Sequence, residues 1–184
     1  MKHNLLAACL LGPALLLSAG ALAESHESEA VAQLIEQRHQ QGPKQILEKV
    51  TEQYSGVITN FELDDQQGVL VYQVEVIDLA NNVKRHLVYD AQTTLFISGK
   101  ETAMTGWFND NKNITAIEEI QETGFSMIKA LEIVQSQHPG FLVDAELENK
   151  KGINLFEIEL ATPEGKQNWL VDISTQDLIP VYRK

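Results

Sequence analysis

An internal repeat constrains this sequence more than any other feature. When the chain is shifted by 84 positions, Gln45–Val50 aligns with Lys129–Val134, and the alignment continues without a gap to Glu75 and its counterpart Glu159. Nine of the 29 aligned positions from Leu47 onward are identical. Because unrelated segments do not share identities at one fixed offset in this way, the sequence predicts two copies of one structural module.

Each copy begins with a segment of helical periodicity. Pro43 suits the first turn of the first helix, and Thr123 or Ser126 can cap the second. Gly56 and Gly140 follow the two segments and indicate where the helices end. The apolar helix faces are Ile46, Leu47, Val50 and Tyr54 in the first copy, and Met127, Ile128, Leu131, Ile133 and Val134 in the second.

An alternating segment follows each helix. Period-two alternation with one polar row is typical of a strand whose second face is wet, so we expect the apolar row to face the helix. In the first copy, the apolar row is Val57, Thr59, Phe61 and Leu63 and the other row is Ile58, Asn60, Glu62 and Asp64. In the second copy, these rows are Phe141, Val143, Ala145 and Leu147, and Leu142, Asp144, Glu146 and Glu148.

Turn residues divide the rest of each copy into further strands. We expect hairpin turns at residues 65–68 and 149–152, second turns at 80–82 and 162–165, third strands at 85–90 and 167–172, and short last strands at 95–97 and 178–181. The sequence therefore predicts an α+β fold of two repeated modules, each one helix packed on an antiparallel β-meander. These modules span residues 43–97 and 124–184 and are joined by a linker at 98–123.

The first 23 residues have the pattern of a secretory signal peptide. A short polar start precedes a mostly apolar stretch that is too short for a stable membrane span, and Ala21-Leu22-Ala23 offers small residues for cleavage after Ala23. Leu6–Cys9 resembles a lipoprotein cleavage site, but Cys9 precedes most of the apolar run instead of following it. We therefore expect a periplasmic or secreted protein with a polar N-terminal segment at residues 24–42.

Charge excludes several classes of partner. The chain carries 26 acidic and 14 basic residues, for a net charge of −12. This balance argues against nucleic acid and against anionic lipid headgroups, since both are recognised by basic patches. Cys9 is the only cysteine, so neither an intrachain disulfide nor a site of several thiolates can form.

The polar rows of the predicted strands collect carboxylates. Such a row is either an ordinary solvated face, a docking surface for a basic partner, or a site of loose divalent-cation binding. The candidate partner-binding residues here are Asp144, Glu146, Glu148, Glu157 and Glu159 in the second module, with Glu62, Asp64 and Glu75 as the first module's row.

Two aromatic residues stand out in the segment between the modules. Trp107 and Phe108 lie beside Gly106, in a stretch with no counterpart in the repeat. Exposed aromatic residues on a loop mark recognition sites, but they also seal small modules that bury too little surface alone. We favour the seal, and we keep both residues as candidates for partner binding.

Two strand–turn–strand segments resemble the PepSY domain. The resemblance lies in Tyr72–Val76 and Phe156–Lys166, which show an aromatic-x-aliphatic-x-aliphatic strand, and in the closing segments Val88–Asp90 and Leu170–Asp172. The family has a glycine shortly after the closing aspartate, where this chain has Thr93-Thr94 and Thr175-Gln176. The resemblance implies a hydrophobic framework without an active site, found in propeptides of secreted peptidases and in extracytoplasmic parts of envelope proteins.

No catalytic, metal-ligand or phosphate-loop motif occurs in the sequence, so we expect no catalytic residues and no cofactor. Our interpretation is a non-enzymatic module that binds another envelope or secreted protein. Restraint of a peptidase or sensing at the cell surface is implied by the resemblance alone. The alternative is an accessory cation-binding protein of an envelope metal or redox system.

Overall fold

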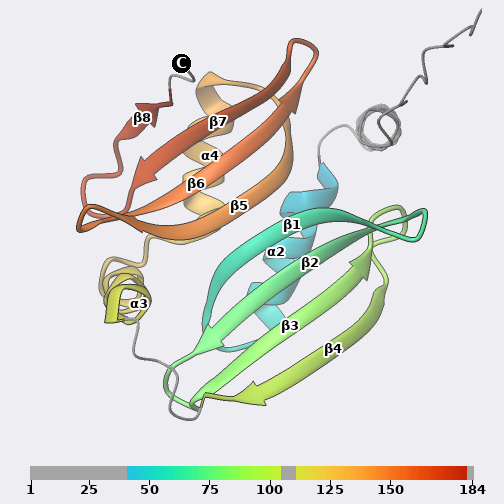
Figure 1. Ribbon diagram of the computed structural model, residues 1–184, viewed down its shortest axis with the longest axis horizontal. Helices are drawn as coiled ribbons and strands as arrows, with labels where there is room; N and C mark the ends of the chain where they lie inside the picture. The colour runs from blue at the N-terminus through green and yellow to red at the C-terminus, as the bar shows by residue number, and fades with distance from the viewer. Residues whose placement is uncertain (1–40, 105–110, 182–184) are drawn as a thin grey trace, which may run out of the picture.

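Two helix-and-meander units form the structure, which is a computed structural model describing residues 41–104 and 111–181 (Figure 1). The first unit comprises α2 (Gln41–Gln53), β1 (Val57–Gln66), β2 (Val69–Asp78), β3 (Val83–Asp90) and β4 (Phe96–Ala103). The helix α3 (Asn111–Thr123) follows it. The second unit comprises α4 (Met127–Gln137), β5 (Phe141–Lys150), β6 (Ile153–Thr162), β7 (Gly165–Asp172) and β8 (Leu178–Pro180). This arrangement confirms the predicted α+β fold.

All eight strands belong to one antiparallel sheet, in the order β4-β3-β2-β1-β5-β6-β7-β8. The two units join through β1 and β5, where Phe61 pairs with Ala145. These two residues are 84 positions apart and are therefore equivalent in the repeat. Since equivalent residues pair with each other in antiparallel strands, the units are related by a local two-fold axis at this seam. The repeat predicted both copies but not the continuous sheet.

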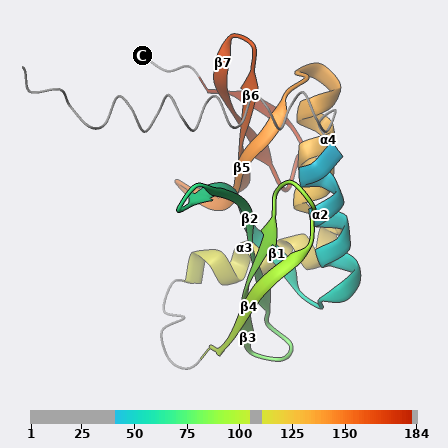
Figure 2. The ribbon, with the colours of Figure 1, turned by 90° about the vertical axis from the view of Figure 1, so that its right-hand side faces the viewer.

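The core lies between the sheet and the helices α2 and α4, which cover the same face (Figure 2). Leu47 and its counterpart Leu131 are 0% and 1% exposed, and the aromatic rings of Tyr72 and Phe156 are fully buried. The equivalent positions of the repeat therefore carry equivalent packing. Lys44 on α2 donates a hydrogen bond to Glu132 on α4 over 2.7 Å and links the two helices.

The segment between the repeats is more ordered than a plain linker. β4 runs to Ala103, so it extends well beyond the short strand expected at residues 95–97 and includes the first residues of the expected linker. The cause is β3, whose residues from Val83 to Tyr89 all have partners on β4. Helix α3 contacts β1 and β5 and buries Ile117 in the common core.

A β-bulge breaks the expected alternation near the start of β1 and again in β5. Ile58, expected on the polar row, pairs with Val76 and belongs to the core. Leu142, its counterpart in the second unit, pairs with Leu160 and also belongs to the core. Thr59, expected on the apolar row, donates a hydrogen bond to the Glu75 carboxylate. One extra residue in a strand moves every side chain before it to the other face of the sheet. This explains why the predicted rows were wrong for Ile58 and Leu142 and for Thr59.

The turns repeat as closely as the strands. Gln67-Gly68 and Lys151-Gly152 form the first hairpin turns with positive φ at both residues, as a two-residue turn of the type I′ class requires. At the later turn, Thr94 and Gln176 have φ values of 59° and 61°. The chain therefore has the left-handed conformation at the turn where the resemblance implies a glycine, at a cost in backbone strain.

Candidate functional site

The carboxylates of the polar rows come together on the sheet face opposite the helices. We call this surface the acidic face. The residues expected on it from β5 and β6 do share it, because Asp144 pairs with Glu159 and Glu146 pairs with Glu157, and cross-strand partners point to the same side. Its members are Glu62, Asp64, Glu75, Asp144, Glu146, Glu148, Glu157 and Glu159.

The centre of the acidic face lies on the seam between the two units. Glu62 of β1 stands opposite Asp144 of β5, which in turn stands opposite Glu159 of β6. In the next row, Asn60 stands opposite Glu146, and Glu146 opposite Glu157. Sequence reasoning found these residues but not their meeting across the seam, since a repeat does not reveal how its copies pair.

Crowding of these groups changes their titration. Partial burial, followed by the charges of Glu62, Glu146, Glu159 and Glu157, raises the pKa of Asp144 to about 7. Burial and the charges of Glu148 and Glu157 also raise the pKa of Glu146. An ionised carboxylate is disfavoured when it loses water and gains like-charged neighbours. The repeat position of Asp144 is held in the first unit by the neutral Asn60.

Lysines compensate the periphery of the acidic face but not its centre. Lys84 pairs with Glu75, Lys166 with Glu159 over 3.1 Å, and Lys150 with Glu157 and Glu148. Within the described residues, no ion pair involves the central carboxylates. These are Glu62, Asp144 and Glu146. The centre is therefore a group of carboxylates that no lysine compensates.

The described residues contain no group of three or more His, Cys, Asp or Glu side chains arranged to hold a metal ion. Trp107 and Phe108, the other candidates for partner binding, lie outside the described residues, as does the expected signal peptide at residues 1–23. Among the helices that the structure describes, none is long and apolar enough to cross a membrane.

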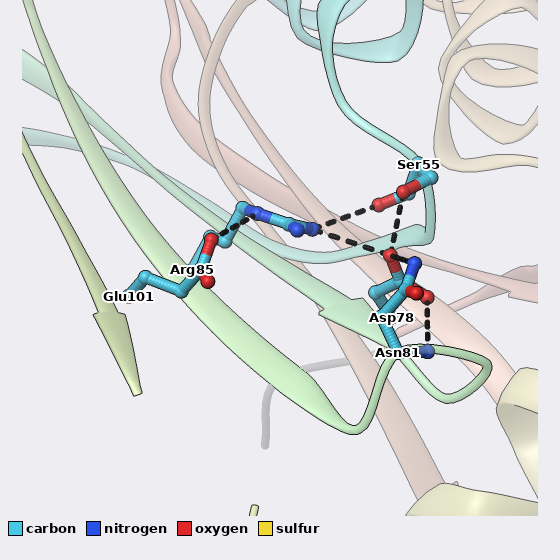
Figure 3. A network of polar contacts seen from close by, with 5 residues as sticks. All are labelled: Ser55, Asp78, Asn81, Arg85 and Glu101. Carbon is cyan, nitrogen blue, oxygen red and sulfur yellow. Dashed lines mark hydrogen bonds and ion pairs between the residues drawn. The ribbon is translucent and has the colours of Figure 1, made fainter. Parts of the chain in front are cut away.

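A second site lies at the outer edge of the first unit and is organised by Arg85 (Figure 3). The Arg85 guanidinium is 2.9 Å from Glu101 and 3.4 Å from Asp78, and it donates to the carbonyl oxygen of Ser55 over 3.2 Å. Hydrogen bonds from the Asn81 amide and the Ser55 hydroxyl, with Arg85 contributing less, hold the pKa of Asp78 well below its usual range. Arg85 is thereby fixed between β4 and the end of α2.

Beside Arg85 the surface is hollowed into a groove of about 200 Å³. We call it the edge groove. Leu87 and Gly99 face each other across β3 and β4 on the helix side of the sheet, and Tyr54 closes the groove from the segment after α2. Its lining residues are Tyr54, Arg85, Leu87, Phe96, Gly99, Lys100 and Glu101.

The second unit fills the corresponding place with its own side chains. His138 is the repeat counterpart of Tyr54, and Trp169, opposite Ile158, corresponds to Leu87 opposite Val74. The His138 and Trp169 rings are stacked, with their centroids 3.7 Å apart. Sequence reasoning missed the edge groove because the predicted linker begins at Ser98, which excludes Gly99 from the sheet. The signal that could have found it is this exchange of residue types between the copies.

The two units correspond to a known domain. The model of the family described as "Peptidase propeptide and YPEB domain", PepSY, matches residues 40–93 and 126–179. The chain belongs to the PepSY family. Its PepSY domains carry the predicted framework in both copies, and domains of this family are generally non-catalytic modules of envelope proteins and propeptides.

Other comparisons add little to the PepSY assignment. A crystal structure of a "putative lipoprotein" from Clostridium difficile 630 is 15% identical over 76% of this chain and 90% of that one, with a TM-score of 0.40. No curated protein matches the chain.

Proposed function

We propose that this chain is a non-enzymatic protein-binding module, secreted or periplasmic, whose acidic face docks a basic surface of another envelope or secreted protein. A secreted peptidase restrained by the module fits this description, as does an envelope protein engaged in sensing. The observation that carries the proposal is the uncompensated centre of the acidic face, formed by Glu62, Asp144 and Glu146.

The physical argument is that this centre is costly to the isolated protein. Like charges directly opposite each other in a sheet are destabilising, and the neutral residue found in the first domain, Asn60, shows that the fold does not require a carboxylate there. Sites that are unfavourable for folding are typical of function. A basic partner would relieve the repulsion, so binding energy and the relief of strain would act together.

The experiment uses matched charge variants. The test variant carries Glu62→Gln, Asp144→Asn and Glu146→Gln. The control carries Glu52→Gln, Glu118→Gln and Glu122→Gln, which removes as many carboxylates from exposed helix positions. The unaltered chain is first cross-linked in its native envelope fraction, and the partner recovered is purified for calorimetry.

We expect the test variant to weaken binding by about tenfold or more, with the control near the original affinity, since close complementary charges contribute more than distant ones. Affinity of the unaltered chain should also fall as salt rises. Equal losses in both variants would mean that net charge alone attracts the partner, and no loss in either would place binding elsewhere.

The cation-binding alternative is separated by titrating the same proteins with calcium. Under the protein-docking proposal, millimolar calcium gives no stoichiometric heat. Tight stoichiometric heat that disappears in the test variant would instead favour the cation-binding function.

The localisation proposal has its own test. We expect the mature protein to begin at Glu24 and to be released by osmotic shock, because the sequence up to Ala23 has the pattern of a cleaved signal peptide. N-terminal sequencing and mass spectrometry of the released protein check this. A lipid-modified N-terminus at Cys9 would contradict it.

A further inference from the structure

The edge groove lies beside the long free edge of the sheet. Among the strands that the structure describes, β4 is the last on its side, all eight of its residues are exposed, and it contains no proline. The opposite edge is β8, which has three residues and ends at Pro180. An edge strand offers unpaired backbone N–H and C=O groups to an incoming strand. β4 is therefore the better of the two edges for strand addition.

The second domain indicates what fits the groove. There, an indole carried by a β-strand occupies the corresponding place and stacks on the ring that replaces Tyr54. In the first domain the strand residue is Leu87, and Gly99 beside it has no side chain. A Cβ atom at Gly99 would come within 3.0 Å of the Phe96 ring and 3.2 Å of Leu87. The Phe96 ring therefore packs directly over Gly99 and against Leu87, and it forms one wall of the groove.

The volume of the edge groove and the charges around it further restrict which side chain can occupy it. A volume of about 200 Å³ is below the usual range for a drug-sized ligand but sufficient for one large side chain. Apolar and aromatic groups of Tyr54, Leu87 and Phe96 line it. The charge of Arg85 is matched by Asp78 and Glu101. Lys100, one residue after Gly99, points to the opposite face of β4 and has no ion-pair partner within the described residues. In an added strand, the residue next to the one in the groove faces the side of Lys100, because neighbouring residues of a strand point to opposite faces, and a carboxylate there would complement Lys100.

We infer that β4 and the edge groove bind an extended segment of another protein, which adds a strand to the sheet, places an aromatic side chain in the groove and presents a carboxylate to Lys100. The edge groove lies on the helix side of the sheet and Lys100 at its outer edge, so neither is one of the carboxylates of the acidic face, and they take a ligand of the opposite charge. The strand-addition inference is tested independently of the proposed function, because the two experiments alter different residues.

The test uses synthetic peptides and the full chain. The probe is a fluorescein-labelled peptide of alternating threonine and valine with one central tryptophan and an aspartate directly after it, so that the two side chains face opposite sides of the added strand. Its controls replace the tryptophan by alanine, or the aspartate by asparagine, or methylate alternate backbone nitrogens. Fluorescence polarisation measures binding.

We expect the tryptophan peptide to bind at least about tenfold more tightly than the alanine peptide, as at an aromatic hot spot. N-methylation should abolish binding, because strand addition depends on main-chain hydrogen bonds. The asparagine peptide should bind more weakly than the aspartate peptide, and this difference should shrink at high salt.

Protein variants locate the site. Gly99→Leu places a side chain in the groove and should reduce binding of the tryptophan peptide by about tenfold or more. Ser98→Leu is the matched control, because the same side chain is added one residue away on the opposite face of β4. Thermal unfolding verifies that both variants fold.

Three results would overturn the inference. They are equal affinity for the tryptophan and alanine peptides, equal loss of binding in the Ser98→Leu and Gly99→Leu variants, and a chain that is already dimeric through β4 in sedimentation analysis. The last result would make a second copy of this chain the occupant. The peptide comparison on the unaltered chain needs no variant, so it decides the matter even if Gly99→Leu does not fold.

Discussion

The two PepSY domains share a core and differ on their surfaces. Leu47 and Leu131, like Tyr72 and Phe156, occupy equivalent buried positions. On the polar face, the first domain has Asn60 where the second has Asp144. At the outer edge, the first domain has an open groove with a fixed arginine, whereas the second has a stacked histidine and tryptophan.

This difference shows which positions the fold leaves free. Interior side chains are constrained by close packing, so the copies have kept them alike. Polar-row and edge residues are not constrained by packing, so the copies could diverge there. The edge groove lies where the copies differ, and the centre of the acidic face differs between them at Asn60 and Asp144 while Glu62 and Glu146 are alike. The following predictions test whether the shared core and the divergent positions behave as this comparison requires.

The largest effect is expected in the core. Leu47→Ala and Leu131→Ala each remove a fully buried side chain, and each should lower the free energy of unfolding by about 2–5 kcal/mol. Because the two positions are equivalent, the two losses should be of similar size. Urea unfolding followed by circular dichroism measures both, and a large loss in one variant with almost none in the other would break the comparison.

A smaller effect on the free energy of unfolding is expected at the β1–β5 seam, and its size depends on pH. The folded-state pKa of Asp144, about 7, lies above the usual value near 3.8, so the folded chain binds a proton more readily than the unfolded chain does. The stability contributed by this proton is fully present below pH 3.8 and is lost as pH rises through 7. Asp144→Asn should therefore be the more stable protein at pH 8, by about 1–2 kcal/mol once solvent screening of this half-buried group is considered.

The converse variant sharpens this prediction. Asn60→Asp adds a carboxylate opposite Glu146 and Glu75. Between pH 5 and pH 8, this variant should therefore lose more stability than the unaltered chain does. Denaturant melts at the two pH values give the comparison. A stability difference between Asp144→Asn and the original that does not change with pH would contradict the crowding of charge at the seam.

The smallest effect is expected at the two late turns. Thr94→Gly should stabilise the protein by about 0.5–1 kcal/mol, because glycine adopts positive φ without the strain of a β-branched residue. Gln176→Gly should stabilise it less, since glutamine is not β-branched. Thermal melts of both variants test this order, and destabilisation by Thr94→Gly would show that its side-chain contacts outweigh backbone strain.

Much of the fold could be predicted because the repeat and the strand periodicity act locally. The helix faces, the hairpin turns and the cap at Ser126 all follow from short-range patterns, and the cap is present, with the Ser126 hydroxyl accepting from the Lys129 N–H. The bulges at Thr59 and Val143 could not be predicted, because an extra residue leaves the alternation of residue types almost unchanged.

Only part of the two candidate surfaces could be predicted from the sequence. The carboxylates of β5 and β6 were identified because alternation places them on one face. Their meeting with Glu62 depends on the pairing of β1 with β5, a long-range contact that no local pattern encodes. The edge groove depends on β4 running on past residue 97 to Ala103, which is set by its pairing with β3 and not by its own composition.

The central claim is that the two PepSY domains form one structural unit through the β1–β5 seam. Differential scanning calorimetry of the Leu47→Ala variant tests it most directly, because the altered residue lies in the first domain alone. We predict one cooperative transition, shifted as a whole to lower temperature, with equal calorimetric and van't Hoff enthalpies. Two transitions, of which only one shifts, would contradict the claim.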